Sequence, residues 1–257
     1  MMMRSTEPKY RLPLNPEQIE ILELLYKFRF VTVATVKDYF AESNPGMNVF
    51  MRLDTLENQS LIAKRYFDNY RLLHKPVVYY LLPAGARKLA ECREEDDTDE
   101  IKVKAIYRDG VVREQFAMHS VAVFKLYNRL SEQYGGDMDF FSRSDQAGFD
   151  DFPKPLPDAY VMLQADNEAT RHFFVDILDD DAHLIADASK KIKRLIRYGR
   201  SGSWVTTGSP FPAVIFVCNS DEASKRVQKR CEAALHKAWV FDIKFSAATF
   251  DTIELSI

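Results

Sequence analysis

The stretch NVFMRLDTLENQSLIAKRYFDNYRLLHKPVVYYLL, residues 48–82, decides how the first third of this chain folds. Its first part places Phe50, Leu53 and Leu56 at helical spacing, which predicts a helix over about residues 47–58 with that face buried. Its second part holds two apolar runs around a turn-prone segment, which predicts a β-hairpin. The opposite face of the helix is polar and carries, at successive helical turns, Asn48, Arg52, Thr55 and Gln59.

Two further helices are expected before this stretch. Asn15 followed by Pro16 is a typical helix start and predicts a helix to about Phe28, and Thr32 caps a second helix through Phe40. Three helices followed by a hairpin are the layout of a winged helix, whose third helix enters the major groove of DNA while basic hairpin residues neutralise phosphate. The basic residues on or near the hairpin are Lys64, Arg65, Arg71 and Lys75.

A winged helix can also bind proteins, and a polar helix face is usually only solvated. We favour DNA contact because the polar helix face and the basic hairpin fall on the same side of the expected fold. Residues 1–93 carry 14 lysines and arginines against 10 aspartates and glutamates, a modest excess within a chain of net charge -3. Such an excess suits weak or dimer-assisted binding, so a homodimer on double-stranded DNA is expected.

An acidic run at residues 94–100 follows this basic third. Such a run predicts a linker, because charges of one sign repel each other and stay solvated. We therefore expect a winged-helix domain over residues 1–93, an acidic linker over 94–112 and a second domain over 113–257. No stretch approaches the roughly 20 apolar residues that span a bilayer, and no secretory signal is recognisable, which predicts a cytoplasmic protein without a membrane partner. The three cysteines are expected to be structural thiols.

The second domain is expected to be a mixed α/β fold. A helix over about residues 114–134 precedes three strands, a basic helix over about 188–198, an apolar strand at 213–218 and a further helix and strand. This αβββαβ order matches the core of PD-(D/E)xK nucleases. The basic helix predicts a second face for phosphate contact, or else a merely solvated face, made of Lys190, Lys193, Arg194 and Arg197.

Several short segments together resemble one family of proteins. They are residues 14–22, 30–32, 52–56, 78–86, 119–123, 157–159, 173–176 and 193–198. They are similar to the replication-relaxation family, which is encoded largely on plasmids and other mobile elements. The resemblance implies DNA binding linked to replication, relaxation or mobilisation in conjugation, a relaxase or replication protein as partner, and a C-terminal domain related to restriction endonucleases.

The nuclease chemistry is incomplete in the sequence. Such nucleases hold Mg²⁺ with two carboxylates, for which Asp158 and Asp176 are the candidates, and use a lysine two residues after the second carboxylate to orient water. Leu178 stands at that lysine position, and Lys190 or Lys193 would have to supply the amine. We therefore expect no efficient DNA cleavage, and no cofactor unless the domain is an active nuclease that uses Mg²⁺.

Three functions remain open at this point. The favoured function is a DNA-binding protein of a mobile element with an inactive nuclease-like domain. The alternatives are a Mg²⁺-dependent endonuclease with a relocated lysine, and a winged-helix transcription regulator. His119 and His172 are expected to pack or to be exposed instead of binding a metal. Signature motifs of NTPases, dinucleotide enzymes, α/β-hydrolases and zinc proteases are absent from the sequence.

Overall fold

The computed structural model of the chain describes residues 13–93, 106–164, 169–178, 183–239 and 242–255. It divides into two compact units, Met1–Val121 (unit 1) and Ala122–Ile257 (unit 2). The acidic run at residues 94–100 lies outside the described residues. None of the helices in the described part of the chain combines the length and the apolar character that crossing a bilayer requires.

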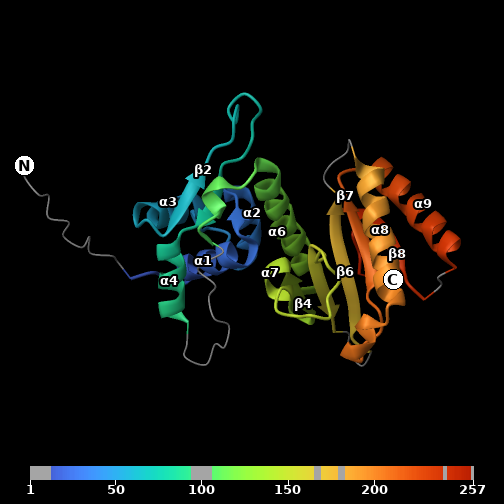
Figure 1. The fold of residues 1–257 in the computed structure, drawn as a ribbon. Helices are drawn as coiled ribbons and strands as arrows, with labels where there is room; N and C mark the ends of the chain where they lie inside the picture. Colours follow the sequence, from blue (N-terminus) through green and yellow to red (C-terminus); the bar gives the residue numbers. More distant parts are fainter. Residues whose placement is uncertain (1–12, 94–105, 165–168, 179–182, 240–241, 256–257) are drawn as a thin grey trace, which may run out of the picture. The chain divides into compact units, whose positions relative to one another are not determined.

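Unit 1 contains helices and one small sheet, in the order expected for a winged helix (Figure 1). The sheet has the order β1-β3-β2 and is antiparallel throughout. Side-chain caps begin the helices: Asn15 accepts a hydrogen bond from the backbone of Gln18, and Thr32 accepts one from Thr35. The elements are α1 (Pro16–Phe28), β1 (Phe30–Val31), α2 (Val33–Tyr39), α3 (Val49–Asn58), β2 (Ile62–Arg65), β3 (Val78–Leu81) and α4 (Pro83–Cys92).

The buried face of α3 differs from the expectation. Phe50 is 60% exposed, whereas Val49, Leu53 and Leu56 are buried. The expectation that Phe50 belongs to the core stripe is therefore wrong. Residues at i, i+4 and i+7 share one side of a helix. Val49, Leu53 and Leu56 have this spacing, whereas Phe50 does not have it with the same two leucines.

The long helix α6 (Glu114–Tyr134) begins in unit 1 and continues into unit 2. Its first turns belong to the core of unit 1, because Ala117 and Val121 pack in one apolar cluster with Phe30, Phe67 and Val78. The compact units consequently divide within α6, between residues 121 and 122, and not at the acidic run.

Unit 2 is built on a five-stranded sheet of order β4-β5-β6-β7-β8. The first three strands are antiparallel neighbours, and the last three are parallel. With α6 before β4 and α8 between β6 and β7, the expected αβββαβ order is confirmed, and the fold is a mixed α+β fold. The elements are β4 (Met138–Ser142), α7 (Arg143–Gln146), β5 (Ala159–Leu163), β6 (Arg171–Leu178), α8 (Leu184–Arg200), β7 (Ala213–Cys218), α9 (Asp221–Ala238) and β8 (Phe245–Thr249).

Helices α8 and α9 run side by side against one face of this sheet (Figure 1). The inward stripe of α8 includes Ala188, Ile192 and Leu195, and that of α9 includes Val227 and Cys231; all five are fully buried. Parallel strands connected by helices require such a cover, because each crossover places its helix on the sheet face. The outward sides of both helices are left to solvent.

Candidate functional site

The two aspartates singled out from the sequence lie on neighbouring strands of unit 2. Asp158 directly precedes β5, and Asp176 lies in β6, where Val175 pairs with Ala159. Asp158 is 0% exposed and Asp176 is 1% exposed. Carboxylates this deeply buried need compensating charge or hydrogen bonds, because desolvation of an isolated charge is costly.

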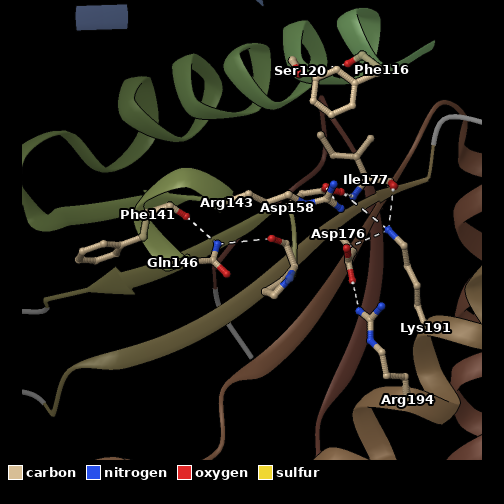
Figure 2. Close-up of polar contacts among 11 residues, drawn as sticks. Phe116, Ser120, Phe141, Arg143, Gln146, Asp158, Asp176, Ile177, Lys191 and Arg194 are labelled. Carbon is tan, nitrogen blue, oxygen red and sulfur yellow. Dashed lines mark hydrogen bonds and ion pairs between the residues drawn. The ribbon is translucent and has the colours of Figure 1, made fainter. Parts of the chain in front are cut away.

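Lys191 on α8 supplies a large part of this compensation. Its Nζ lies 2.8 Å from Asp176 Oδ1, 3.8 Å from Asp158 Oδ2 and 3.3 Å from the carbonyl oxygen of Ile177. Figure 2 shows the Lys191 side chain reaching from α8 toward these oxygens. One ammonium group therefore interacts with both carboxylates and with the strand that carries one of them.

Two arginines complete the cluster, which we call the Asp158–Asp176 cluster. Arg143 Nη2 lies 2.6 Å from Asp158 Oδ1, and Arg194 Nη2 lies 3.6 Å from Asp176 Oδ2 (Figure 2). The backbone N–H of Ile177 also donates to Asp158 Oδ2 at 2.7 Å. Three cationic side chains thus surround two carboxylates. Within the described residues, Asp176 Oδ2 and Arg194 Nη2 are buried without a hydrogen bond, so this side of the cluster is held by charge alone.

The lysine that reaches the carboxylates is neither of the two candidates from the sequence. Lys190 has a 78% exposed side chain and lies 3.1 Å from Asp187, and Lys193 is exposed. The sequence analysis did not single out Lys191 as the partner of the carboxylates, although its position beside the buried stripe of α8 indicated it. Lys191 and Arg194 border the buried stripe of α8 and are three residues apart, so they share the edge of the helix that faces β6.

Arg194 therefore faces Asp176 instead of the outer surface. Of the predicted second basic face, Lys190, Lys193 and Arg197 are exposed on α8, whereas Arg194 has a 22% exposed side chain. The described residues contain no group of three or more histidine, cysteine, aspartate or glutamate side chains that could hold a metal ion.

The oxygen atoms of the cluster meet only part of what a Mg²⁺ site requires. Two carboxylates and the Ile177 carbonyl are oxygen donors of the kind that Mg²⁺ prefers. However, the Lys191 ammonium already contacts all three, and Arg143 and Arg194 add two more positive charges. A divalent ion in the same place would face like charge on three sides. The residues in this arrangement do not fit a resident metal ion.

His172 pairs with a tyrosine and not with the aspartates. Its Nδ1 shares a hydrogen bond of 2.6 Å with Tyr160 Oη, and the two rings are stacked. Burial lowers the pKa of His172 and raises the pKa of Tyr160 to about 12, because each charged form would lose its hydration. Of the two alternatives expected for His172, packing or exposure, the structure shows packing against Tyr160. His119 is half-buried in α6.

In unit 1, several residues predicted to face DNA have partners within α3 or near it. Asn48 accepts a hydrogen bond from the Met51 backbone as the N-cap of α3, and the Thr55 hydroxyl donates to the Met51 carbonyl. Arg52 Nη2 lies 4.0 Å from Glu17 Oε2, and Gln59 is the half-buried C-cap of the helix. All four residues lie on one flank of α3.

The four basic residues of the hairpin fall into two classes. Arg65 is half-buried and donates to the carbonyl of Val112 at 2.6 Å, which makes it a structural contact. Lys64 lies 2.7 Å from Glu57, whose hydrogen bond raises the pKa of Lys64, and Lys75 lies 2.7 Å from Glu114. Arg71 is exposed and donates to Tyr70 Oη. Lys64, Arg71 and Lys75 remain near the surface.

Comparison with known proteins adds one decisive observation. A family model described as replication-relaxation matches residues 22–213, which include most of unit 1 and the whole Asp158–Asp176 cluster. The chain belongs to the replication-relaxation family. No curated protein matches its sequence.

Among solved structures, this member of the replication-relaxation family is similar to two structures of the restriction endonuclease FokI, one of them bound to DNA. The sequence identities are 10% and 9%, the TM-score is 0.30 for each, and 91% of this chain is covered. The chain spans 42% of the FokI chain. The element order and strand pairing described above, and not this likeness, define the fold.

Proposed function

We propose that the protein binds double-stranded DNA of a plasmid or another mobile element and acts in its replication, relaxation or mobilisation. In this proposal unit 1 contacts the duplex, unit 2 is a nuclease-like scaffold, and the protein works in the cytoplasm as a homodimer beside a relaxase or replication protein. Membership of the replication-relaxation family supports the biological setting.

The observation that carries the proposal is the arrangement of unit 1. Helix α3 is followed by the β2–β3 hairpin, and the segment between the two strands contains the exposed Arg71. Winged helices use this combination of a third helix and a basic hairpin to contact bases and phosphates. The polar flank of α3 supports base contact by Arg52, whose side chain is 39% exposed.

The ion pairs of Lys64 with Glu57 of α3 and of Lys75 with Glu114 of α6 do not oppose DNA binding by the hairpin. A lysine–glutamate pair near the surface contributes little to stability, because water screens both charges. A phosphate can therefore replace Glu57 beside Lys64, or Glu114 beside Lys75, at little cost, and counterions released from the duplex favour the exchange.

The test is duplex binding by the full chain over a salt series. Alanine at both Lys64 and Arg71 should lower affinity for all duplexes and reduce the salt slope by about 0.9 for each lost phosphate contact. Arg52→Ala should weaken discrimination between sequences more than it weakens overall affinity. Arg65 is unsuitable for this test because it holds the Val112 carbonyl. Wild-type binding and salt slope in the Lys64/Arg71 variant would refute the proposal.

A second candidate function is a Mg²⁺-dependent endonuclease; it requires Mg²⁺ to displace the Lys191 ammonium from the two carboxylates, and one observation favours it. Lys191 brings an amine to 2.8 Å from Asp176, which supplies the group that Leu178 lacks. Supercoiled plasmid should be incubated with wild type, Asp176→Asn and Lys191→Met, with Mg²⁺ or Mn²⁺ present. We expect no efficient nicking by any of the three. Robust nicking by wild type that both substitutions abolish, while circular dichroism shows both variants folded, would establish the endonuclease.

A further inference from the structure

The outer layer of unit 2 is far more basic than the chain as a whole. Helices α8 and α9 together carry eleven lysines and arginines against four aspartates and glutamates, although the net charge of the chain is -3. Lys191 and Arg194 are directed at the buried carboxylates, so they do not contribute to this surface. The remaining excess is concentrated on the outward sides of two adjacent helices.

These cations come from both helices and lie around a shared seam. Arg230 Nε of α9 donates to Ser189 Oγ of α8 at 2.7 Å, which places Arg230 where the helices meet. Lys193 is one turn after Ser189, and Arg226 is one turn before Arg230, so both lie next to that contact. Lys193 and Arg226 are exposed. The exposed basic residues of α8 and α9 are Lys190, Lys193, Arg197, Arg200, Lys225, Arg226, Lys229, Arg230 and Lys237.

The spacing of the charges suits an extended polyanion. Lys190, Lys193 and Arg197 follow at i, i+3 and i+7, which spreads three charges over about 10 Å of helix. Each strand of duplex DNA presents one phosphate per roughly 3.4 Å of helix axis, so a ridge of this length meets several phosphates at once. Lys190 can exchange its partner Asp187 for a phosphate at small cost, because the Lys190–Asp187 ion pair is exposed.

The same surface is a poor match for a membrane. Helices that lie on a bilayer insert an apolar face next to their basic face. The apolar stripes of α8 and α9 are buried against the sheet, and neither helix has an exposed large apolar side chain. Trp239, directly after α9, is exposed and stacks on His236; among the described residues it is the one exposed large apolar side chain next to these helices.

We propose that the outward surface of α8 and α9 binds the phosphate backbone of duplex DNA without reading its sequence, as a second contact in addition to unit 1. This inference rests on the proposed function, because it takes the same DNA as the ligand. Two separate contacts on one chain would allow it to hold one duplex at two places or to bridge two segments.

The test measures binding of the full chain to a labelled duplex of arbitrary sequence over a KCl series. The surface variant combines Lys193→Ala, Arg226→Ala and Lys229→Ala, none of which belongs to the Asp158–Asp176 cluster. The matched control removes three exposed cations outside α8 and α9, with Arg87→Ala in α4 and Lys154→Ala and Lys244→Ala in loops. Circular dichroism and urea unfolding should show that both triple variants fold like wild type.

We expect the surface variant to reduce the salt slope by about 2 to 3, at about 0.9 for each lost phosphate contact, and the control to leave it nearly unchanged. An equal slope in wild type and the surface variant, or an equal reduction in the control, would overturn the inference. The Lys64/Arg71 variant separates the two proposals. If only that variant loses binding, the second contact is refuted; if only the surface variant does, the role of unit 1 is refuted. Absence of duplex binding by wild type would refute both.

Discussion

At the scale of single residues, the stability of unit 2 depends on charges that the protein buries. Asp158, directly before β5, and Asp176, within β6, are compensated by Lys191, Arg143 and Arg194. A buried ion pair gains little over an apolar pair, but removing one partner leaves the other charge uncompensated. Lys191 is the most consequential member, because its single ammonium contacts both carboxylates and the Ile177 carbonyl.

Lys191→Met should therefore lower the free energy of unfolding by about 3 kcal/mol, the cost typical of breaking a buried ion pair. Methionine retains the length and apolar stem of the lysine, so the loss reports on the charge. Lys193→Met, on the exposed side of the same helix, should change stability by less than about 0.5 kcal/mol. Urea unfolding of the three proteins measures both values. Equal stability of wild type and Lys191→Met would mean that the two arginines compensate the carboxylates alone.

His172 gives unit 2 a defined pH dependence. Burial lowers the pKa of His172 below its value of about 6.5 in an unfolded chain. As pH falls through about 6.5, the unfolded chain binds a proton that the folded state resists, so the free energy of unfolding decreases until pH reaches the lowered folded pKa. His172→Gln should lack this decrease. Unfolding of both proteins in urea from neutral to mildly acidic pH measures the difference; parallel pH profiles would contradict it.

At the scale of secondary-structure elements, the close approach of α4 to the sheet of unit 1 sets its position. Gly85 in α4 leaves no room for a side chain, because an added Cβ would overlap the Leu61 carbonyl oxygen and lie 2.7 Å from Leu81 Cδ1. The Leu61 carbonyl belongs to the backbone and also accepts from the Leu82 N–H, so it cannot move aside freely. The glycine is thus required by packing and not by helix formation.

Gly85→Ala should destabilise unit 1 by about 1–3 kcal/mol, the usual cost of overpacking. The sign of this stability change distinguishes packing from helix propensity, because replacing glycine by alanine within a helix normally stabilises by roughly 0.5–1 kcal/mol. Gly148→Ala is the control, because an added Cβ there meets nothing within 4 Å. Thermal unfolding of both variants tests the expectation, and a rise in the melting temperature of Gly85→Ala would contradict the close approach.

At the scale of the whole molecule, α6 belongs to the cores of both compact units. Ala117 and Val121 complete the apolar cluster of unit 1, while Tyr127 packs edge-on against Phe140 of β4 in unit 2. A boundary placed before α6 therefore removes apolar side chains from unit 1. A stable fragment of unit 1 should therefore end within α6, after Val121, and not at the acidic run.

A fragment of residues 1–121 should consequently be more stable than one of residues 1–113, by about 2–3 kcal/mol. The shorter fragment exposes apolar surface of Phe30, Phe67 and Val78 that Ala117 and Val121 cover in the full chain, and burial of one such side chain contributes about 1.5–3 kcal/mol. Urea unfolding followed by circular dichroism measures the difference. Equal stabilities would show that these contacts add nothing to unit 1.

The sequence by itself determined the order of the main helices and strands, because local patterns specify them, although β1, α4 and α7 were not predicted. Caps at Asn15 and Thr32 and the apolar runs of the strands depend on neighbouring residues only, and the structure has these elements where they were expected. Asp158 and Asp176 could be chosen as a candidate pair because they occupy the two carboxylate positions of the PD-(D/E)xK nuclease pattern. The family resemblance, carried by short segments, was confirmed.

Only the tertiary structure decided which side chains meet. Lys190, Lys191 and Lys193 are chemically alike and adjacent, and the rotation of α8 on the sheet selects Lys191 for the carboxylates. The same rotation turns Arg194 inward, and packing in unit 1 exposes Phe50 while it buries Val49. A rotation of about 100° per residue separates successive helical side chains, so one position along the chain decides between a buried ion pair and the surface.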